Sequence, residues 1–113
     1  MRLRLATLVS TLLVTSPAFA DFQCFGTIVD LLIYADGTVN IKTTYRNDYT
    51  NICNLQTTRQ GVDPFTCALW VGAIESARKM NQSIHVYYQS NGEFSCTTIP
   101  IHGSSPAPVY IGH

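Results

Sequence analysis

The stretch CALWVGAIESARKMNQSIHVYYQS, residues 67–90, changes its hydrophobic period halfway along, and this change decides the fold. Up to Met80 the apolar residues recur every three or four positions, as they do on one side of an α-helix. The expected apolar stripe consists of Leu69, Trp70, Ala73, Ile74, Ala77 and Met80. The period then falls to two, which is typical of a β-strand. The alternating residues are Ile84, Val86 and Tyr88 on one side and His85, Tyr87 and Gln89 on the other.

The helix has a recognisable beginning, and strands are expected before it. Asp63 is a suitable N-cap, and Pro64 suits the first helical position, where its missing N–H costs nothing. Upstream, alternating residues predict a strand over 23–34, a hairpin turn at 35–37, a return strand over 38–46 and a short strand around 52–55. In the return strand the expected inward residues are Val39, Ile41, Thr43 and Tyr45. The expected outward residues are Asn40, Lys42, Thr44 and Arg46.

After the helix and its following strand, residues 94–99 are expected to form a fifth strand, ended by Pro100. Residues 103–113 are then either a last short strand or a loose C-terminal tail. The order of three strands, one helix and two strands predicts a mainly β fold. Its expected form is a small five-stranded Greek-key barrel of the OB-fold type with two disulfides. An open α+β sandwich with the helix on one face is the alternative.

The first twenty residues have the features of a secretory signal peptide. Met1, Arg2 and Arg4 give a positive start, an apolar run follows, and SPAFA ends in small residues. Cleavage is expected between Ala20 and Asp21, which leaves one domain over residues 21–113. The expected location is therefore secreted or periplasmic.

All four cysteines, Cys24, Cys53, Cys67 and Cys96, lie in this domain. An even number in a small exported chain predicts two disulfides, for which three connectivities are possible. The favoured pairs are Cys53–Cys67, between the third strand and the first helical turn, and Cys24–Cys96, between the first and fifth strands. Neither CxxC nor zinc-ligand spacing occurs, so no metal and no cofactor is expected.

Charge argues against two classes of partner. Without Arg2 and Arg4 the seven Lys and Arg residues fall to five, against seven acidic ones, and they are scattered. Nucleic-acid binding needs a basic patch, so it is not expected. Because no second long apolar segment follows, membrane insertion is not expected either.

No catalytic residue is assigned, and the chain is not expected to be an enzyme. His85, His102 and His113 have no recognisable Ser or Cys nucleophile as a partner. Asp30 lies among apolar neighbours in a covered strand, where a carboxylate needs a partner. A structural hydrogen bond is the preferred explanation for it.

Aromatic residues carry the stronger binding signal, because tyrosine combines an apolar ring with a polar tip. The domain contains Tyr34, Tyr45, Tyr49, Tyr87, Tyr88 and Tyr110. The candidate ligand contacts are Tyr88, Tyr87, His85, Phe25 and Tyr45. Core packing is an equal alternative for Tyr45 and Tyr88.

Residues 53–90 with Cys96, and more weakly the segment FGTIVDLLIYADG at 25–37, resemble the B-subunit family of subtilase cytotoxin and typhoid toxin. The shared pattern is a short strand bearing Cys53, the helix, a turn and a strand ending in Tyr87-Tyr88. The resemblance implies an OB-fold protomer that forms a ring of five, recognises glycans and delivers a catalytic A-type subunit. Glycan-binding relatives have a sugar-contacting serine where Phe25 stands here, which does not support recognition of sialic acid.

Two kinds of function follow as expectations. The first is a non-enzymatic module that binds a glycan or glycoprotein receptor, as a homo-oligomer and with an A-type partner. The second is a monomeric periplasmic protein-binding module, such as an inhibitor of a secreted hydrolase, acting through the loop at 45–51. An exported hydrolase is the least favoured.

Overall fold

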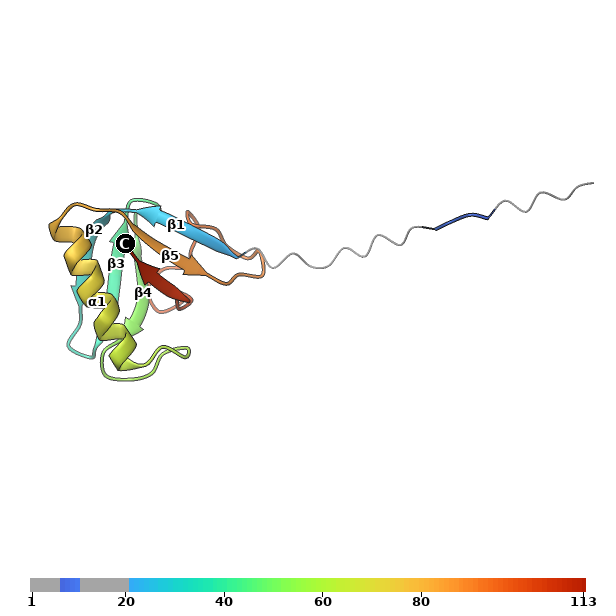
Figure 1. Ribbon diagram of the computed structural model, residues 1–113. Helices are drawn as coiled ribbons and strands as arrows, with labels where there is room; N and C mark the ends of the chain where they lie inside the picture. The colour runs from blue at the N-terminus through green and yellow to red at the C-terminus, as the bar shows by residue number, and fades with distance from the viewer. Residues whose placement is uncertain (1–6, 11–20) are drawn as a thin grey trace, which may run out of the picture.

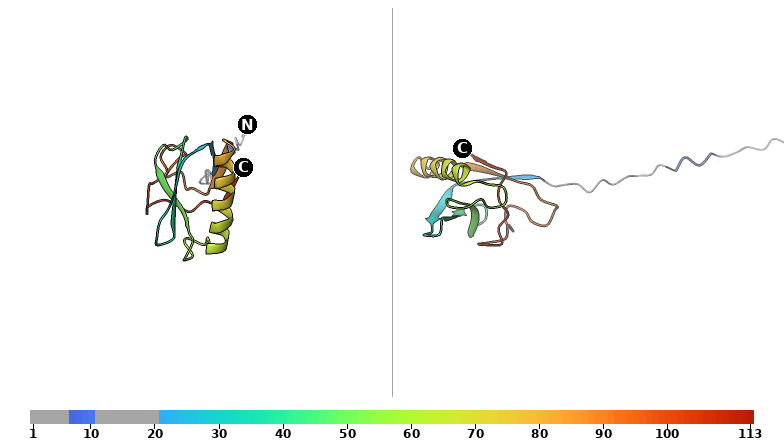
Figure 2. Two further views of the ribbon diagram at one scale, coloured as in Figure 1. Left: turned by 90° about the vertical axis from the view of Figure 1, so that its left-hand side faces the viewer. Right: turned by 90° about the horizontal axis from the view of Figure 1, so that it is seen from below.

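The computed structural model describes residues 7–10 and 21–113, so most of the predicted signal peptide, residues 1–20, lies outside the described residues. The domain is mainly β, with two small antiparallel sheets and one helix (Figure 1). The first sheet contains, in spatial order, β1 (Phe22–Gly26), β5 (Ile84–Tyr88) and β6 (Tyr110–Gly112). The second contains β2 (Ile28–Ile33), β3 (Thr38–Thr43) and β4 (Tyr49–Asn54). The helix α1 (Pro64–Lys79) lies along one side of the domain, against β2, β4 and β6 (Figure 2).

The single strand expected over 23–34 is divided at Thr27, which is a correction to the sequence prediction. β1 pairs with β5, whereas β2 pairs with β3, so the chain turns from one sheet into the other. Thr44, the residue directly after β3, stabilises this corner. Thr44 N–H donates to the Thr27 carbonyl and Thr27 N–H donates to Thr44 Oγ1, both at 3.1 Å. Gly26 is needed here, because a Cβ would come 2.5 Å from Thr44 Oγ1.

The predicted hairpin joins β2 to β3 through a turn at Gly37, whose φ of 89° favours glycine. Val39, Ile41 and Thr43 are buried, as predicted. Asn40 was expected to face water but is only 2% exposed, because Tyr34 covers it and its amide donates to Tyr34 OH at 3.2 Å. β3 also ends at Thr43 rather than at residue 46, and β4 begins earlier than expected.

The helix begins as predicted. Asp63 caps it by accepting a hydrogen bond from Thr66 N–H at 2.7 Å, and Pro64 is the first helical residue. The buried residues of the helix are Cys67, Trp70, Ile74 and Ala77. Leu69 and Met80 were expected in this stripe, but they are 60% and 62% exposed. The buried side of the helix is therefore rotated toward Cys67, which a disulfide holds against β4.

The predicted fifth strand over 94–99 is wrong. This segment forms turns in which Ser95 N–H donates to Thr98 Oγ1 at 2.8 Å and Thr98 N–H donates to the Ser95 carbonyl at 3.1 Å. Ser and Thr side chains offer the backbone such local bonds in place of a sheet. The last strand is instead β6, antiparallel to β5. Of the two alternatives for residues 103–113, a short strand or a loose tail, the structure therefore shows the short strand. The element order is thus four strands, one helix and two strands.

The core lies between the two sheets and α1. Its fully buried members include Val39, Ile41, Ile52, Ile74, Ile84, Val86, Tyr88 and Ile99. Two disulfides, Cys24–Cys96 and Cys53–Cys67, tie it together, and they are the pairs that the sequence favours. Cys96 lies in the turn region instead of a strand. Disulfides of this kind point to an extracellular or otherwise oxidising compartment. In the described part of the chain, no helix has the length and apolar character needed to cross a bilayer.

Candidate functional site

The outer surface of the β1-β5-β6 sheet carries a row of aromatic rings. The strand register places Phe25 opposite His85 and His85 opposite Gly112. One step along, it places Gln23 opposite Tyr87 and Tyr87 opposite Tyr110. Residues two apart in a strand share a side of the sheet, so these side chains project together. We refer to Gln23, Phe25, His85, Tyr87 and Tyr110 as the aromatic face.

The rings of the aromatic face contact one another in sequence. The His85 ring lies between those of Phe25 and Tyr110, with both centroid distances at 5.9 Å. Tyr87 and Tyr110 stack at 5.0 Å with an angle of 6° between their planes. Phe25 is 62% exposed, although apolar rings are usually covered in a folded domain. An exposed, mutually packed aromatic surface is typical of a binding site.

Hydrogen bonds fix the polar tips of the two tyrosines. Tyr87 OH donates to Asp21 Oδ2 at 2.6 Å, and this bond raises the pKa of the Tyr87 phenol. The amide of Gln23 donates to Tyr110 OH. Both partners, Asp21 and Gln23, come from the start of β1. The two rings are therefore held in place before any ligand arrives.

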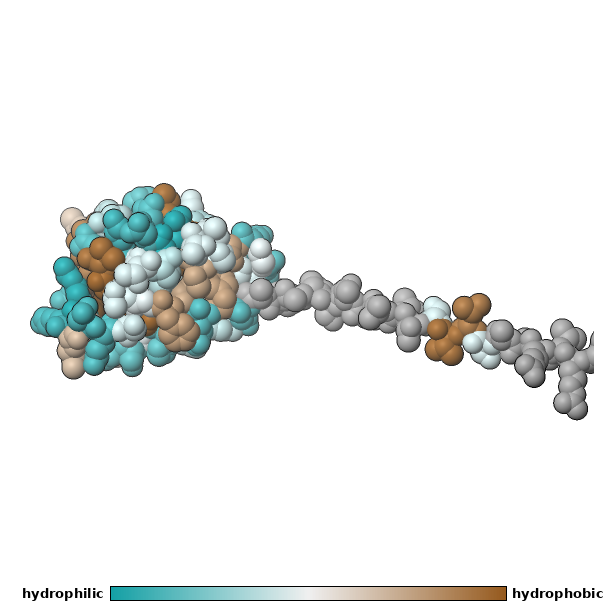
Figure 3. Space-filling view, turned by 90° about the horizontal axis from the view of Figure 1, so that it is seen from above, coloured by the Kyte–Doolittle hydropathy of each residue, from teal (hydrophilic) through white to brown (hydrophobic). Residues whose placement is uncertain are grey.

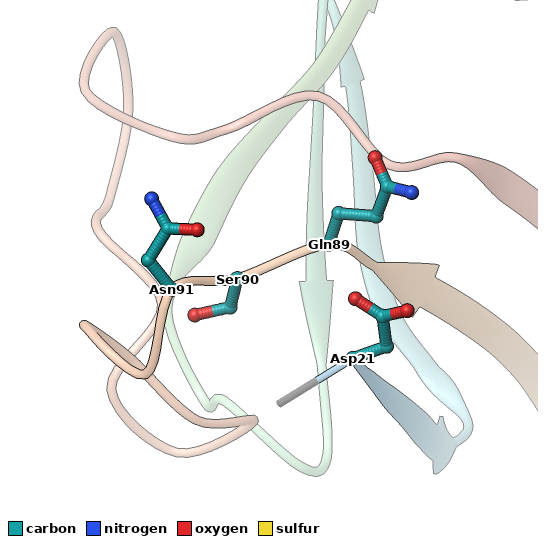
Figure 4. A pocket seen from close by; sticks show the side chains of 4 residues that line it. All are labelled: Asp21, Gln89, Ser90 and Asn91. Atoms are coloured by element: carbon teal, nitrogen blue, oxygen red, sulfur yellow. The ribbon is translucent and has the colours of Figure 1, made fainter. Parts of the chain in front are cut away.

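Asp21 also connects the aromatic face to a polar cavity of about 420 Å³. The cavity is lined by Asp21, at the start of β1, and by Gln89, Ser90 and Asn91, which directly follow β5 (Figure 4). These residues provide one carboxylate, two amides and one hydroxyl. Such groups can both donate to and accept from a ligand that is rich in hydroxyl groups.

The structure brings together three of the five predicted contact residues, Phe25, His85 and Tyr87. The other two, Tyr88 and Tyr45, do not lie on this surface with them. Tyr88 is 1% exposed and its ring stacks on Phe22 at 5.5 Å, inside the core. The Tyr45 hydroxyl is buried as well, and burial raises the pKa of Tyr45 to about 12. The Tyr88 side chain therefore cannot reach a ligand on the surface, and the Tyr45 hydroxyl is not accessible to one.

Sequence reasoning left seven residues out of this site. Four are at the aromatic face, Asp21, Gln23, Tyr110 and Gly112, and three line the cavity, Gln89, Ser90 and Asn91. Gln23 could have been found, because it lies two positions before Phe25 and alternation gives it the same side. Tyr110 and Gly112 depend on β6 pairing with β5, and no local pattern in the sequence announces that pairing.

Asp30 of β2, which needed a partner, has one in the same sheet, Tyr49 of β4. Tyr49 OH donates to Asp30 Oδ2 at 2.6 Å, and Leu31 N–H donates to Oδ1 at 2.9 Å. The bond with Tyr49 lowers the pKa of Asp30 and raises that of Tyr49. Lys42 lies 5.7 Å from the Tyr49 ring centroid, and His102 stacks on that ring at 6.2 Å. These contacts are those of a hydrogen-bonded surface cluster.

A second cavity, of about 350 Å³, lies beside the Cys24–Cys96 disulfide. Its lining is mostly apolar and consists of Phe22, Phe94, Ser95, Cys96 and Thr97. It lacks the paired donors and acceptors of the cavity at Asp21. Within residues 7–10 and 21–113, no three His, Cys, Asp or Glu side chains are grouped closely enough to hold a metal ion.

Gly112 leaves the space in which the His85 ring lies, and this gives a first prediction. A Cβ at Gly112 would come 2.6 Å from His85 Nε2, so Gly112→Ala should displace the ring. The backbone at Gly112 is not in the left-handed region, and we expect stability to change by less than about 0.5 kcal/mol. NMR should show shifted ring signals for Phe25 and Tyr110. Gly103→Ala is the control, because a Cβ added at Gly103 would have no other atom within 4 Å. Unchanged ring signals in Gly112→Ala would contradict the prediction.

The candidate site therefore combines the packed rings of the aromatic face with a neighbouring set of hydrogen-bonding groups at the polar cavity. Asp21 belongs to both parts, since it accepts from Tyr87 and lines the cavity. Comparison of the chain with protein-family models, with curated proteins and with solved structures finds no match.

Proposed function

We propose that this protein is a non-enzymatic binding module that recognises glycans through the aromatic face and the polar cavity beside it. The observation that carries the proposal is the row of packed, accessible rings that ends at a fixed carboxylate. A pyranose ring has an apolar surface of C–H groups and a rim of hydroxyls. An aromatic ring can stack on the first, and a few placed polar groups can bind the second.

The proposed fold is an OB-type barrel, closed where the two sheets meet. Two features support closure. The chain passes from β1 to β2 through Thr27 alone, so the sheets share a corner. At the other side, Thr50 of β4 forms a parallel bridge with His102, whose N–H donates to the Tyr49 carbonyl at 3.0 Å. The segment around His102 would then connect β4 toward β6.

Assembly into a ring of copies is part of the proposal. Figure 3 shows separate brown apolar patches between polar residues on one surface of the molecule. Large apolar side chains that are strongly exposed include Phe65, Leu69 and Met80 of α1 or its end, and Val29 and Ile33 of β2. A neighbouring copy would cover such groups, and several copies would strengthen weak glycan sites by multivalency. Such a ring, exported to the periplasm or secreted, could carry a separate catalytic A-type subunit.

Ring assembly can be measured directly. Light scattering of the disulfide-bonded protein should give a mass of several protomers, near five for the toxin-like ring. Leu69→Glu should lower that mass, because it places a charge in the covered surface, whereas Lys79→Glu, on the same helix, should not. A strictly monomeric wild-type protein would count against the ring but not against glycan binding.

The glycan proposal is tested by removing one ring of the aromatic face. We expect Tyr110→Ala to lower glycan-array binding by about five- to tenfold, since one aromatic contact contributes about 1–1.5 kcal/mol. Val109→Ala is the control, because it shortens an exposed apolar side chain next to Tyr110 but removes no ring from the aromatic face. Circular dichroism should show both variants folded. If Tyr110→Ala binds as well as the wild type, the aromatic face is not the glycan site.

A further inference from the structure

We infer that the site selects uncharged glycans over glycans that carry a carboxylate or sulfate group, an inference that rests on the proposed function. The only ionised carboxylate in contact with the aromatic face, among the described residues, is that of Asp21. It accepts a hydrogen bond from Tyr87 at 2.6 Å and it also lines the polar cavity. Asp21 therefore places one negative charge at the site.

None of the five permanent positive charges of residues 21–113 contacts the aromatic face. Proteins bind carboxylate and sulfate groups chiefly with Arg and Lys side chains. Lys42 lies over Tyr49, Arg46 donates to the Ile99 carbonyl, Arg59 donates to the Ser105 carbonyl, and Arg78 pairs with Glu75 in α1. The fifth, Lys79, is in the last turn of α1. Across residues 21–113, none of the five forms a hydrogen bond, ion pair or cation–π contact with the aromatic face.

The predicted cleavage after Ala20 would not reverse this balance. It would place an α-ammonium group on Asp21, beside that residue's own carboxylate. One positive charge at the same residue at most offsets one negative charge. The aromatic face would still lack the net positive charge that would attract an anionic sugar.

The same carboxylate favours neutral sugars. An ionised carboxylate has about four acceptor positions, and Tyr87 occupies one of them. Sugar hydroxyls can donate to the remaining positions, and hydrogen bonds to a charged acceptor are stronger than neutral ones. A sialylated or sulfated sugar would instead bring a second negative charge close to Asp21. Like charges repel, so the anionic sugar should bind more weakly.

The test is an array of matched glycan pairs, each an uncharged oligosaccharide and its sialylated or sulfated derivative. It is probed at physiological salt with the disulfide-bonded protein. We expect the uncharged member of each bound pair to bind at least about tenfold more strongly, which corresponds to 1.4 kcal/mol. Asp21→Asn should reduce this preference to less than about threefold, because the amide keeps an acceptor but has no charge. Glu75→Gln, which removes a negative charge on α1 and not at the site, should keep the preference.

The outcomes separate this inference from the proposed function. If the anionic members bind equally or better, and Tyr110→Ala lowers that binding, the glycan site stands and the selectivity is overturned. If Asp21→Asn keeps the full preference, the role of the Asp21 charge is overturned. If the wild-type protein binds no glycan on the array, both the selectivity and the proposed function fail.

Discussion

Replacing Cys24 and Cys96 together by alanine is expected to lower the free energy of unfolding by about 4 kcal/mol. The two cysteines are 72 residues apart, so their disulfide closes a loop that covers most of the domain. Without it the unfolded chain gains conformational entropy, and the stability of the fold falls accordingly. Because the stability of a small domain is commonly about 5–15 kcal/mol, this loss removes a large share of it. Urea unfolding followed by circular dichroism measures the change.

A nearby control separates the covalent link from the surrounding turn. Thr97→Ala alters an exposed residue next to Cys96 and should change stability by less than about 0.5 kcal/mol. If the Cys24→Ala/Cys96→Ala variant unfolded at the same urea concentration as the wild type, pairing with β5 alone would be enough to hold β1. The disulfide would then have no role in stability.

Local signals explain which elements could be predicted. The helix start depends on Asp63 and Pro64, which are adjacent in sequence and act on the same turn. The hairpin at Gly37 and the alternation of β5 are equally local. In each case the residues that determine the structure lie within one element, so a short window of sequence contains the cause.

The errors arise where distant segments decide the structure. The division of the first strand at Thr27 follows from its contacts with Thr44, seventeen positions away. β6 forms because it pairs with the edge of β5. Residues 94–99 form turns because their Ser and Thr side chains hydrogen-bond the local backbone. Asn40 is buried by Tyr34, a contact that the alternation of β3 alone does not reveal.

The candidate site divides in the same way. Alternation along β1 and β5 places Phe25, His85 and Tyr87 on one side of a sheet, and the structure brings them together. Tyr110 reaches the same surface from the far end of the chain, through strand pairing. Alternation also groups Tyr88 with Ile84 and Val86, so its burial follows from the pattern, although its phenol made it a candidate contact.

Alkaline pH is expected to destabilise the protein through two buried tyrosines. Within the described residues, the hydroxyls of Tyr45 and Tyr88 are buried and have no hydrogen-bond partner. Burial raises the pKa of Tyr45 to about 12 and raises that of Tyr88 further. In the unfolded chain both phenols ionise near their ordinary pKa of about 10. The stability that these two neutral phenols contribute is therefore fully present below about pH 10. It is lost as the pH rises above about 10, up to about pH 12 for Tyr45 and beyond that for Tyr88.

At pH 11 the expected loss is about 1.4 kcal/mol for each of the two tyrosines, or about 3 kcal/mol together. Tyr45→Phe and Tyr88→Phe each remove one ionisable group and keep the ring, so each should move the alkaline unfolding midpoint to higher pH. Tyr34→Phe is the control: because Tyr34 is exposed, this variant should lose as much stability between pH 8 and pH 11 as the wild type, whatever its stability at pH 8. Rapid urea unfolding at pH 8 and pH 11, before base can cleave the disulfides, gives the difference. A Tyr88→Phe variant that lost as much stability between these pH values as the wild type would show that this phenol already reaches water in the folded state.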